Sequence, residues 1–398
     1  MMSKKLLQIN ITANWGSTGK IAEQIGLCAM KHEWESYIAY GRWCNPSKSH
    51  LIKVGNKLDM YMHYGEQRIR DNEGLCSRRA TKRLIKRICE INPDVVQLHN
   101  IHDHYLNYRL LFEYLNKTDI KVVWTLHDCW AFTGHCFHFV TKNCDKWKNG
   151  CFECPLKNEY PKTFLDRSKK HWLLKKELFA GCKNLTIVPV SDWLANFVKE
   201  SFLKEKRIHV IKNGVDLNIF KPTTLYLSEP NRKFKILAVS SVWYPDKGEL
   251  DIYKLREMLS EDQFEIIIVG LSAEQHKELP KGIIGIQRTQ NLQELVQLYS
   301  NADVLINPTY ADTFPTVNLE ALACGTPVIT YRTGGSPEAI DEKTGVVIEQ
   351  GDVDGLVAAI RMMKEKHLSS TDCRKRAEER FDKDKCFEKY LELYEKLI

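Results

Sequence analysis

The sequence predicts an α/β protein built from two doubly wound domains. Apolar runs typical of buried strands alternate with helical stretches along the chain, which favours parallel sheets covered by helices on both faces. The chain has 398 residues, more than one ordinary hydrophobic core accommodates. A polar segment at 223–233, which contains Pro230, interrupts the alternation and is the best candidate for a linker.

Each expected strand is a short run rich in Val, Ile and Leu. The first half of the chain gives such runs at 6–11, 37–40, 95–98, 122–126 and 185–190. The second half gives them at 234–239, 265–269, 304–306 and 328–331. Residues 382–398 carry apolar side chains at helical spacing, which predicts an amphipathic helix at the end of the sequence.

The composition excludes several classes of protein. Hydrophobic residues make up 43% and charged residues 27%, as in ordinary globular proteins, and no apolar run reaches the length of a membrane span. The opening stretch is too short for a signal peptide and is interpreted as the first core strand of a cytoplasmic protein. The net charge of +7 suits anionic substrates or an anionic membrane surface. Because the dense basic stripe of a nucleic-acid binder is missing, no nucleic-acid partner is expected.

The segment 311–329 is the most informative in the sequence. Asp312 follows an apolar strand, and Glu320 comes eight residues later inside a short helix expected at 317–324. Thr316 is expected to cap this helix, whose free N–H groups near Thr316 and Val317 would bind an anion such as phosphate. Two carboxylates beside a phosphate site suit the hydroxyls of a nucleotide-sugar. The plainer alternative is a loop acid and a solvated helix acid.

Further candidates follow other strands. Lys247 comes after the strand at 234–239 and could pair with a diphosphate, or be a surface lysine. Gly16 lies in a turn after the first strand, where glycine lets the backbone approach a ligand, although the P-loop spacing is absent. His127 ends the strand at 122–126, and a structural histidine is its alternative. His99 and His102 follow the strand at 95–98. A loop that contacts a substrate is favoured there over a metal cluster.

The thirteen cysteines include a group with metal-ligand spacing. Cys136, Cys144, Cys151 and Cys154 place a C-x2-C pair within twenty residues of two further thiols, which suits a tetrahedral structural zinc site. Free thiols are the alternative, and a disulfide framework is not expected without a secretion signal.

Two basic stretches, 78–87 and 169–176, scan as amphipathic helices. A basic amphipathic face can rest on anionic lipid, so they indicate peripheral contact with a membrane. Ordinary solvated outer helices are the alternative.

The segment 311–329 resembles the E-x7-E signature of the family 4 retaining glycosyltransferases of the GT-B fold, with Asp312 in place of the first Glu. The resemblance extends to 333–338, to 213–216 and to 189–191. The cysteine-rich stretch resembles an insertion in the subgroup near the colanic-acid and capsule transferases. In two places the chain departs from the family pattern: Pro315 replaces a glycine, and Ser241 and Val242 stand where an arginine is usual.

The resemblance implies two Rossmann-like domains that face a cleft, with a C-terminal helix that crosses back to the first domain. Residues 1–222 would bind the acceptor and carry the cysteine-rich insertion at about 129–156. Residues 223–380 would bind the nucleotide-sugar, and 381–398 would form the returning helix.

The resemblance also implies roles for the candidate residues. The catalytic residues would be Asp312, which contacts the donor sugar hydroxyls, and His127, which lies near that sugar. Glu320 would hold the ribose, and the other donor-binding residues would be Gly16, Lys247, Thr316 and Val317. His99 and His102 would face the acceptor.

The family's chemistry needs no cofactor, so any zinc would be structural. The expected partners are a nucleotide-diphosphate sugar and a glycan or lipid-linked glycan acceptor, in surface polysaccharide synthesis at the inner face of the cytoplasmic membrane. Two alternatives remain open: another GT-B enzyme, such as a nucleotide-sugar epimerase or a phosphorylase-like enzyme, or a non-catalytic, zinc-stapled nucleotide-binding module.

Overall fold

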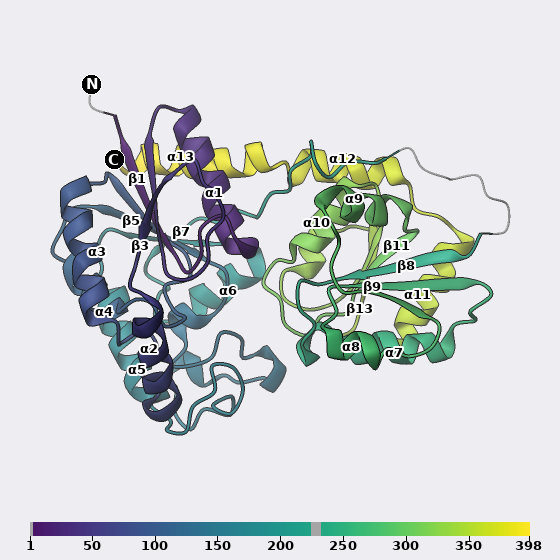
Figure 1. The fold of residues 1–398 in the computed structure, drawn as a ribbon, viewed down its shortest axis with the longest axis horizontal. Helices are drawn as coiled ribbons and strands as arrows, with labels where there is room; N and C mark the ends of the chain where they lie inside the picture. Colours follow the sequence, from purple (N-terminus) through teal and green to yellow (C-terminus); the bar gives the residue numbers. More distant parts are fainter. Residues whose placement is uncertain (1–2, 224–231) are drawn as a thin grey trace. The chain divides into compact units, whose positions relative to one another are not determined.

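The computed structural model describes residues 3–223 and 232–398. The chain forms two compact units, one made of residues 1–212 with 387–398 and the other of residues 213–386 (Figure 1). Each unit is built on one parallel sheet, as the continuous apolar runs predict. Residues 224–231, which make up most of the expected linker, lie outside the described residues.

The first unit holds a seven-stranded parallel sheet in the order β3-β2-β1-β4-β5-β6-β7. Its strands are β1 (Lys5–Asn10), β2 (Glu35–Tyr40), β3 (His50–Lys53), β4 (Val95–Leu98), β5 (Lys121–Leu126), β6 (Leu185–Pro189) and β7 (Arg207–Ile208). Its α-helices are α1 (Gly16–Lys31), α2 (Lys57–Arg70), α3 (Arg78–Ile91), α4 (Tyr108–Leu115), α5 (Ser168–Lys175) and α6 (Asp192–Glu200).

Alternate side chains of this sheet fill two separate cores. Leu7 of β1 and Val96 of β4 belong to one buried cluster, whereas their neighbours Leu6 and Val95 belong to another. This is the two-residue period of a strand that is covered on both faces. The apolar stripe of α1, which includes Ile25, contributes to the second cluster.

The second unit holds a six-stranded parallel sheet in the order β10-β9-β8-β11-β12-β13. Its strands are β8 (Phe234–Val239), β9 (Phe264–Val269), β10 (Ile283–Ile286), β11 (Val304–Asn307), β12 (Val328–Tyr331) and β13 (Gly345–Ile348). Its α-helices are α7 (Glu249–Met258), α8 (Ala273–Lys277), α9 (Leu292–Asn301), α10 (Thr316–Ala323), α11 (Val353–Glu365) and α12 (Ser370–Arg380).

The last helix, α13 (Lys383–Leu397), begins in the second unit and ends in the first, which confirms the expected crossing. Its buried residues Tyr390 and Tyr394 pack in the same core cluster as Leu6 and Ile25. The boundary between the units falls after residue 212 and not after 222. The reason is that Val215 pairs with the chain before α13, where its N–H donates to the carbonyl of Phe381 at 2.7 Å.

The nine strands expected from sequence are all present within one or two residues of their predicted ends. Four short strands, β3, β7, β10 and β13, were not predicted. They are the edge strands of the two sheets. Three of the four residues in β3 are exposed, and its sequence lacks a continuous apolar run. The strands β10 and β13 are apolar, but each has only four residues and contains a glycine. The cysteine-rich stretch contains only short 3-10 turns among its described residues.

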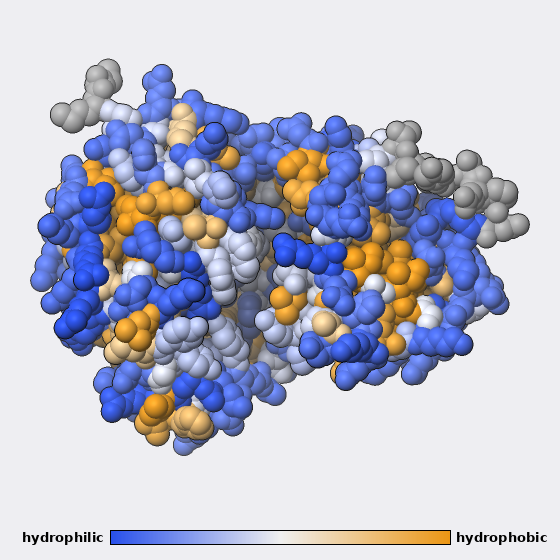
Figure 2. All heavy atoms as spheres, in the orientation of Figure 1, coloured by the Kyte–Doolittle hydropathy of each residue, from blue (hydrophilic) through white to orange (hydrophobic). Residues whose placement is uncertain are grey.

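Among the described residues, no helix combines the length and apolar character that crossing a bilayer requires. The face drawn in Figure 2 is mainly hydrophilic, with separate apolar patches.

Candidate functional site

In the second unit, the loops after β8 and β11 bring Lys247 and Asp312 together. Lys247 ends a 3-10 turn, Pro245–Lys247, and Asp312 lies in the loop between β11 and α10. The Nζ of Lys247 is 2.6 Å from Oδ2 of Asp312, and the two side chains are 29% and 21% exposed. Lys247 and Asp312, which two different sequence patterns indicated, therefore form one partly solvated ion pair.

Glycines hold the two loops in close contact. Gly248 has a φ of +76°, and a Cβ placed on it would lie 2.1 Å from the carbonyl oxygen of Pro308. A Cβ on Gly334, whose φ is +57°, would lie 1.6 Å from the carbonyl oxygen of Asp312. The backbone of Asp312 is thus fixed by a neighbouring turn that only glycine permits.

Helix α10 begins one residue earlier than predicted, and Thr316 is its first residue and not its cap. Pro315 occupies the capping position, and no side chain among the described residues caps the helix. The prediction of Thr316 as N-cap was wrong because Pro315, with its fixed φ, ends the extended loop. The N–H groups of the first turn, including those of Thr316 and Val317, therefore point out of an uncapped helix start and can bind an anion.

Glu320 is held by a residue that the sequence reasoning missed. The hydroxyl of Tyr299, on α9, donates to Oε2 of Glu320 at 2.8 Å. Tyr299 is fully buried, and burial together with the nearby Glu320 carboxylate raises its pKa well above the usual value, so it stays a donor. From sequence Tyr299 has the spacing of a core residue, and no local pattern marks its contact with Glu320.

In the first unit, the turn after β1 contains Gly16, which opens α1 with a φ of +64°. Gly19, in the first turn of α1, leaves no room for a side chain, since a Cβ there would lie 2.6 Å from Oγ1 of Thr12. Trp15 and Trp43 lie beside this turn with 4.6 Å between their ring centroids, and they are 43% and 51% exposed. Two exposed, paired indoles offer an apolar face to a ligand, and sequence reasoning missed them.

His99 and His127 lie at the carboxyl ends of β4 and β5 and contact each other. Nδ1 of His99 is 3.1 Å from Nε2 of His127, and the two rings lie edge to edge, with 5.4 Å between their centroids and 14° between their planes. Burial, and then the neighbouring imidazole, lowers the pKa of His99 well below its usual value. Burial lowers the pKa of His127 to about 4. Both rings are therefore neutral near pH 7.

His102 is a buried cation and not an open ligand. Its Nε2 lies 2.9 Å from Oδ2 of Asp128, and its Nδ1 lies 3.7 Å from Oδ2 of Asp103. Burial alone would lower the pKa of His102, but these two carboxylates outweigh it and raise the pKa to about 10. Glu73, His102 and Asp103 bring their ligand atoms within 4.8 Å of one another. Because Asp128 and Asp103 already lie against the two ring nitrogens of His102, we describe this set as an ion-pair cluster.

Both family models that match the chain describe glycosyltransferases. The model for glycosyl transferases group 1 matches residues 233–365, and the model for Glycosyltransferase Family 4 matches residues 58–219. The chain belongs to the family 4, or group 1, glycosyltransferases. The loop with Asp312 and the helix with Glu320 lie within the first match, and His99, His102 and His127 lie within the second.

One curated relative and two solved structures match most of the length of this glycosyltransferase. A protein of Escherichia coli K12, described as the colanic acid biosynthesis glycosyl transferase WcaC, is 25% identical over 373 residues, 88% of this chain and 89% of the relative. The solved sucrose-phosphate synthase of Thermosynechococcus elongatus superposes with a TM-score of 0.72 at 15% identity, over 99% of both chains. Anabaena HepE, solved in complex with UDP-glucose, superposes with a TM-score of 0.64 at 13% identity, over 98% of this chain and 99% of HepE. These superpositions confirm the GT-B fold.

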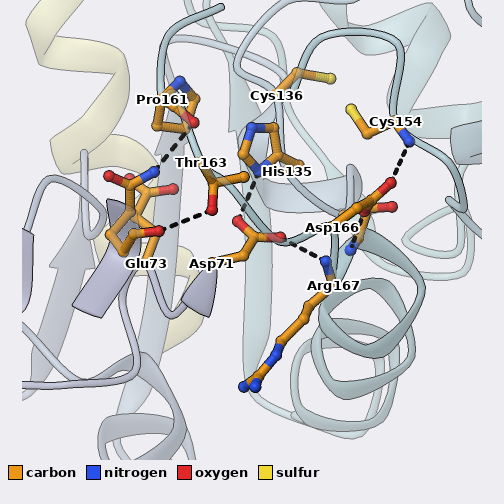
Figure 3. Close-up of polar contacts among 12 residues, drawn as sticks. Asp71, Glu73, His135, Cys136, Cys154, Pro161, Thr163, Asp166 and Arg167 are labelled. Carbon is orange, nitrogen blue, oxygen red and sulfur yellow. Dashed lines mark hydrogen bonds and ion pairs between the residues drawn. The ribbon is translucent and has the colours of Figure 1, made fainter. Parts of the chain in front are cut away.

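The cysteine-rich insertion of this glycosyltransferase gathers part of the expected ligand set. Cys136 and Cys151 are 7% and 8% exposed, and the N–H of Gly134 donates to Sγ of Cys151 at 3.2 Å. In Figure 3 the sulfurs of Cys136 and Cys154 point toward each other. A hydrogen bond from Cys136 lowers the pKa of Cys154 to about 7. Among the described residues, the four sulfurs do not form a set within 4.8 Å.

Two charged groups lie beside these thiols. His135 Nδ1 is 2.8 Å from Oδ1 of Asp71, whose other oxygen accepts from the N–H of Arg167 at 2.8 Å (Figure 3). Burial opposes the charge of His135, but the Asp71 carboxylate outweighs it and raises the histidine's pKa. The ammonium of Lys175 is buried and donates to the carbonyls of Trp130 and Thr133 at 2.7 and 3.1 Å.

Proposed function

We propose that this glycosyltransferase moves a sugar from a nucleotide-diphosphate donor to a hydroxyl acceptor, with retention, in the synthesis of a surface polysaccharide. The observation that supports this most is the Lys247–Asp312 pair, which lies in loops that adjoin the uncapped start of α10. A cation and the N–H groups of a helix start suit a diphosphate, and a carboxylate suits sugar hydroxyls. Two similar proteins point the same way: HepE binds UDP-glucose, and WcaC is described as a colanic acid biosynthesis enzyme.

In the proposed reaction, the bond from the sugar carbon to the diphosphate oxygen breaks while the acceptor oxygen bonds to the same face. Lys247 and the N–H groups of Thr316 and Val317 stabilise the charge that develops on the leaving diphosphate. Asp312 orients the sugar by accepting hydrogen bonds, and Glu320, itself steadied by Tyr299, accepts those of the ribose. The acceptor proton leaves with the diphosphate, so no covalent nucleophile is needed.

Turnover with a panel of nucleotide-sugars tests this proposal directly. A transferase releases nucleoside diphosphate only when an acceptor is present, and NMR of the product shows whether the anomeric configuration is kept. A change of the sugar without an acceptor would identify an epimerase instead. Binding of nucleotide without any release of product would support a non-catalytic module.

We further propose that the acceptor is lipid-linked and that the first unit rests on an anionic membrane. Helix α2 exposes apolar side chains, since Leu58, Tyr61 and Met62 are 66%, 72% and 65% exposed. Helix α3 adds cationic side chains on its polar face, Arg78, Arg79, Lys82, Arg83, Lys86 and Arg87. Exposed apolar side chains on one helix and a basic face on another helix of the same unit suit a bilayer surface with anionic headgroups.

The second basic stretch, 169–176, offers fewer exposed cationic side chains for membrane contact than the sequence indicated. It does form α5, but Lys175 is only 1% exposed and belongs to the core.

Co-sedimentation with vesicles tests the proposed membrane surface. Binding to anionic vesicles should weaken in the double variant Tyr61→Ser, Met62→Ser. The matched control is Tyr244→Ser in the second unit, which removes a tyrosine that is 61% exposed. Equal binding by all three proteins would exclude this face.

We also propose that Cys136, Cys144, Cys151 and Cys154 hold one structural zinc ion. The spacing, the contact between Cys136 and Cys154, and the N–H donor to Cys151 support it. Four zinc-bound thiolates carry a net charge of about −2, which needs nearby positive groups in a buried place. His135, whose pKa the Asp71 carboxylate raises, supplies one of them. Burial lowers the pKa of Lys175 to about 7, and thiolate charge nearby would favour its protonated form.

A further inference from the structure

A line of hydrogen bonds joins the interior of the first unit to His127. Gln8 lies in β1, and its Nε2 donates to the carbonyl of Ala22 in α1 at 2.7 Å. Its Oε1 lies 3.1 Å from Nε2 of His99, whose Nδ1 lies 3.1 Å from Nε2 of His127. Gln8 and His99 are 0% and 1% exposed, so water does not compete for these contacts.

The chemistry of these groups determines where each proton sits. A backbone carbonyl only accepts, so the amide of Gln8 must turn its NH2 toward Ala22 and its oxygen toward His99. That oxygen carries no proton, and therefore Nε2 of His99 does. Because burial keeps His99 neutral by lowering its pKa, its Nδ1 has only a lone pair and accepts the Nε2–H of His127. The neutral ring of His127 then carries a lone pair on Nδ1.

The surrounding backbone keeps the His99 ring from turning away. The N–H of His99 donates to the carbonyl of Ile9 at 3.0 Å, and its carbonyl accepts from the indole of Trp124 at 2.9 Å. A flipped His99 ring would present a C–H group to each of its two partners and lose both buried hydrogen bonds.

We propose that Gln8 and His99 are positioning residues that hold His127 as the Nε2–H tautomer, so that Nδ1 of His127 accepts a hydrogen bond from a sugar hydroxyl. That the hydroxyl belongs to a sugar rests on the proposed function, whereas the tautomer of His127 does not. His127 then orients a hydroxyl and does not deliver a proton to the leaving diphosphate. This assigns roles to two buried polar residues that no catalytic motif contains, and it makes His99 a support for His127 and not an acceptor contact.

The test begins with the ring nitrogens themselves. Protein labelled with 15N-histidine, without any sugar nucleotide, should show His127 between pH 6 and 9 as one neutral species protonated at Nε2. The spectrum of His127→Gln assigns the signal. An imidazolium, an Nδ1–H form or an average of two tautomers would overturn the proposal. Because no donor is present, this result stands or falls separately from transferase activity.

Variants of Gln8 then separate positioning from packing. Gln8→Met removes the acceptor, so His127 should show tautomer averaging and turnover should fall about tenfold, as for one lost hydrogen bond. Gln97→Met is the matched control, because Gln97 is also fully buried, lies on the adjacent strand and donates to Thr125 and not to a histidine. Equal loss in both variants, or wild-type spectra in Gln8→Met, would contradict the proposal.

Gln8→Glu provides the rescue, and it also serves if Gln8→Met fails to fold. A buried, protonated carboxyl can donate to Ala22 and accept from His99 just as the amide does. At pH 6 this variant should restore the His127 spectrum and most of the turnover that Gln8→Met loses. Failure of the rescue in a folded protein would show that Gln8 acts through packing alone.

Discussion

The ammonium of Lys247 and the carboxylate of Asp312 lie 2.6 Å apart at the carboxyl ends of β8 and β11. They come from loops 65 residues apart in sequence, and each stands out by the local pattern around it. Both side chains retain some exposure, so the pair can exchange its partner for a ligand. A diphosphate would take over Lys247 and leave Asp312 to the sugar.

The first prediction concerns this ion pair. Asp312→Ala and Lys247→Met should each lower turnover by about a hundredfold or more, because each removes a group placed for the transition state. The free energy of unfolding should change by less than about 1 kcal/mol, since a partly exposed ion pair contributes little to stability. Arg332→Met, which breaks an exposed pair with Glu349, is the control. Turnover near wild type in Asp312→Ala would remove that residue from the site.

Tyr299→Phe should weaken donor binding while it leaves the fold intact. The variant deletes only the hydroxyl that steadies Glu320, so KM for the donor should rise by about three- to tenfold, the value of one hydrogen bond. The control is Tyr253→Phe, which removes a similar tyrosine–glutamate contact, with Glu249 on α7. Steady-state kinetics on both variants measure the difference. If KM stays unchanged in Tyr299→Phe, Glu320 does not need this support.

Two glycine substitutions should act in opposite directions. Gly334→Ala forces a methyl group against the carbonyl of Asp312, so both stability and turnover should fall. Gly65→Ala, in α2, meets no atom within 4 Å and should add about 0.5–1 kcal/mol of stability, because alanine favours a helix. Chemical denaturation measures both. A Gly334→Ala protein as stable as wild type would show that the turn can relax.

Removal of zinc should destabilise the first unit. Purified protein should contain about one zinc per chain, and a strong chelator or Cys151→Ser with Cys154→Ser should lower its melting temperature. Cys89→Ser is the control, because Cys89 is exposed and lies outside the insertion. Metal analysis that finds no zinc, with no effect of the chelator, would favour four free thiols.

The buried pair of His102 and Asp128 predicts a pH dependence of stability. The pKa of His102 is raised in the folded state, from the ordinary 6.5 to about 10. Its contribution is therefore fully present below pH 6.5 and is lost as the pH rises toward 10. The difference in unfolding free energy between wild type and His102→Gln should shrink over that interval. Urea titrations at pH 6, 8 and 10 would reveal a constant difference if His102 were neutral.

Central strands were predictable because each is a continuous apolar run, and such a run needs no knowledge of its neighbours. The edge strand β3 was not, since its exposed residues lack that signal. The same distinction applies to the site. Asp312 and Glu320 stand out by their spacing along the chain, whereas Tyr299 meets Glu320 only through packing of α9 on α10.

The line from Gln8 to His127 depends on register between parallel strands. Leu6 pairs with Val95 and Gln8 with Gln97, which places His99 within reach of Gln8. No pattern in the sequence specifies that register, so the contact could not be inferred from either segment alone. The cap of α10 was wrongly predicted for a related reason: the position of the helix start depends on the extended loop that Pro315 ends, and not on the capping preference of Thr316 alone.

The measurement that tests the central claim most directly is a melting-temperature screen against nucleoside diphosphates and their sugars, run on wild type and on Glu320→Ala. A ligand at a hundred times its Kd adds about 2.7 kcal/mol of apparent stability. We predict a clear rise in Tm with the diphosphates of one base, which Glu320→Ala loses. Because Glu320→Ala also removes the acceptor of the buried Tyr299 hydroxyl, each rise is measured from that protein's own Tm without ligand. No rise with any nucleotide, or an equal rise in the variant, would contradict the site built on Lys247, Asp312 and Glu320.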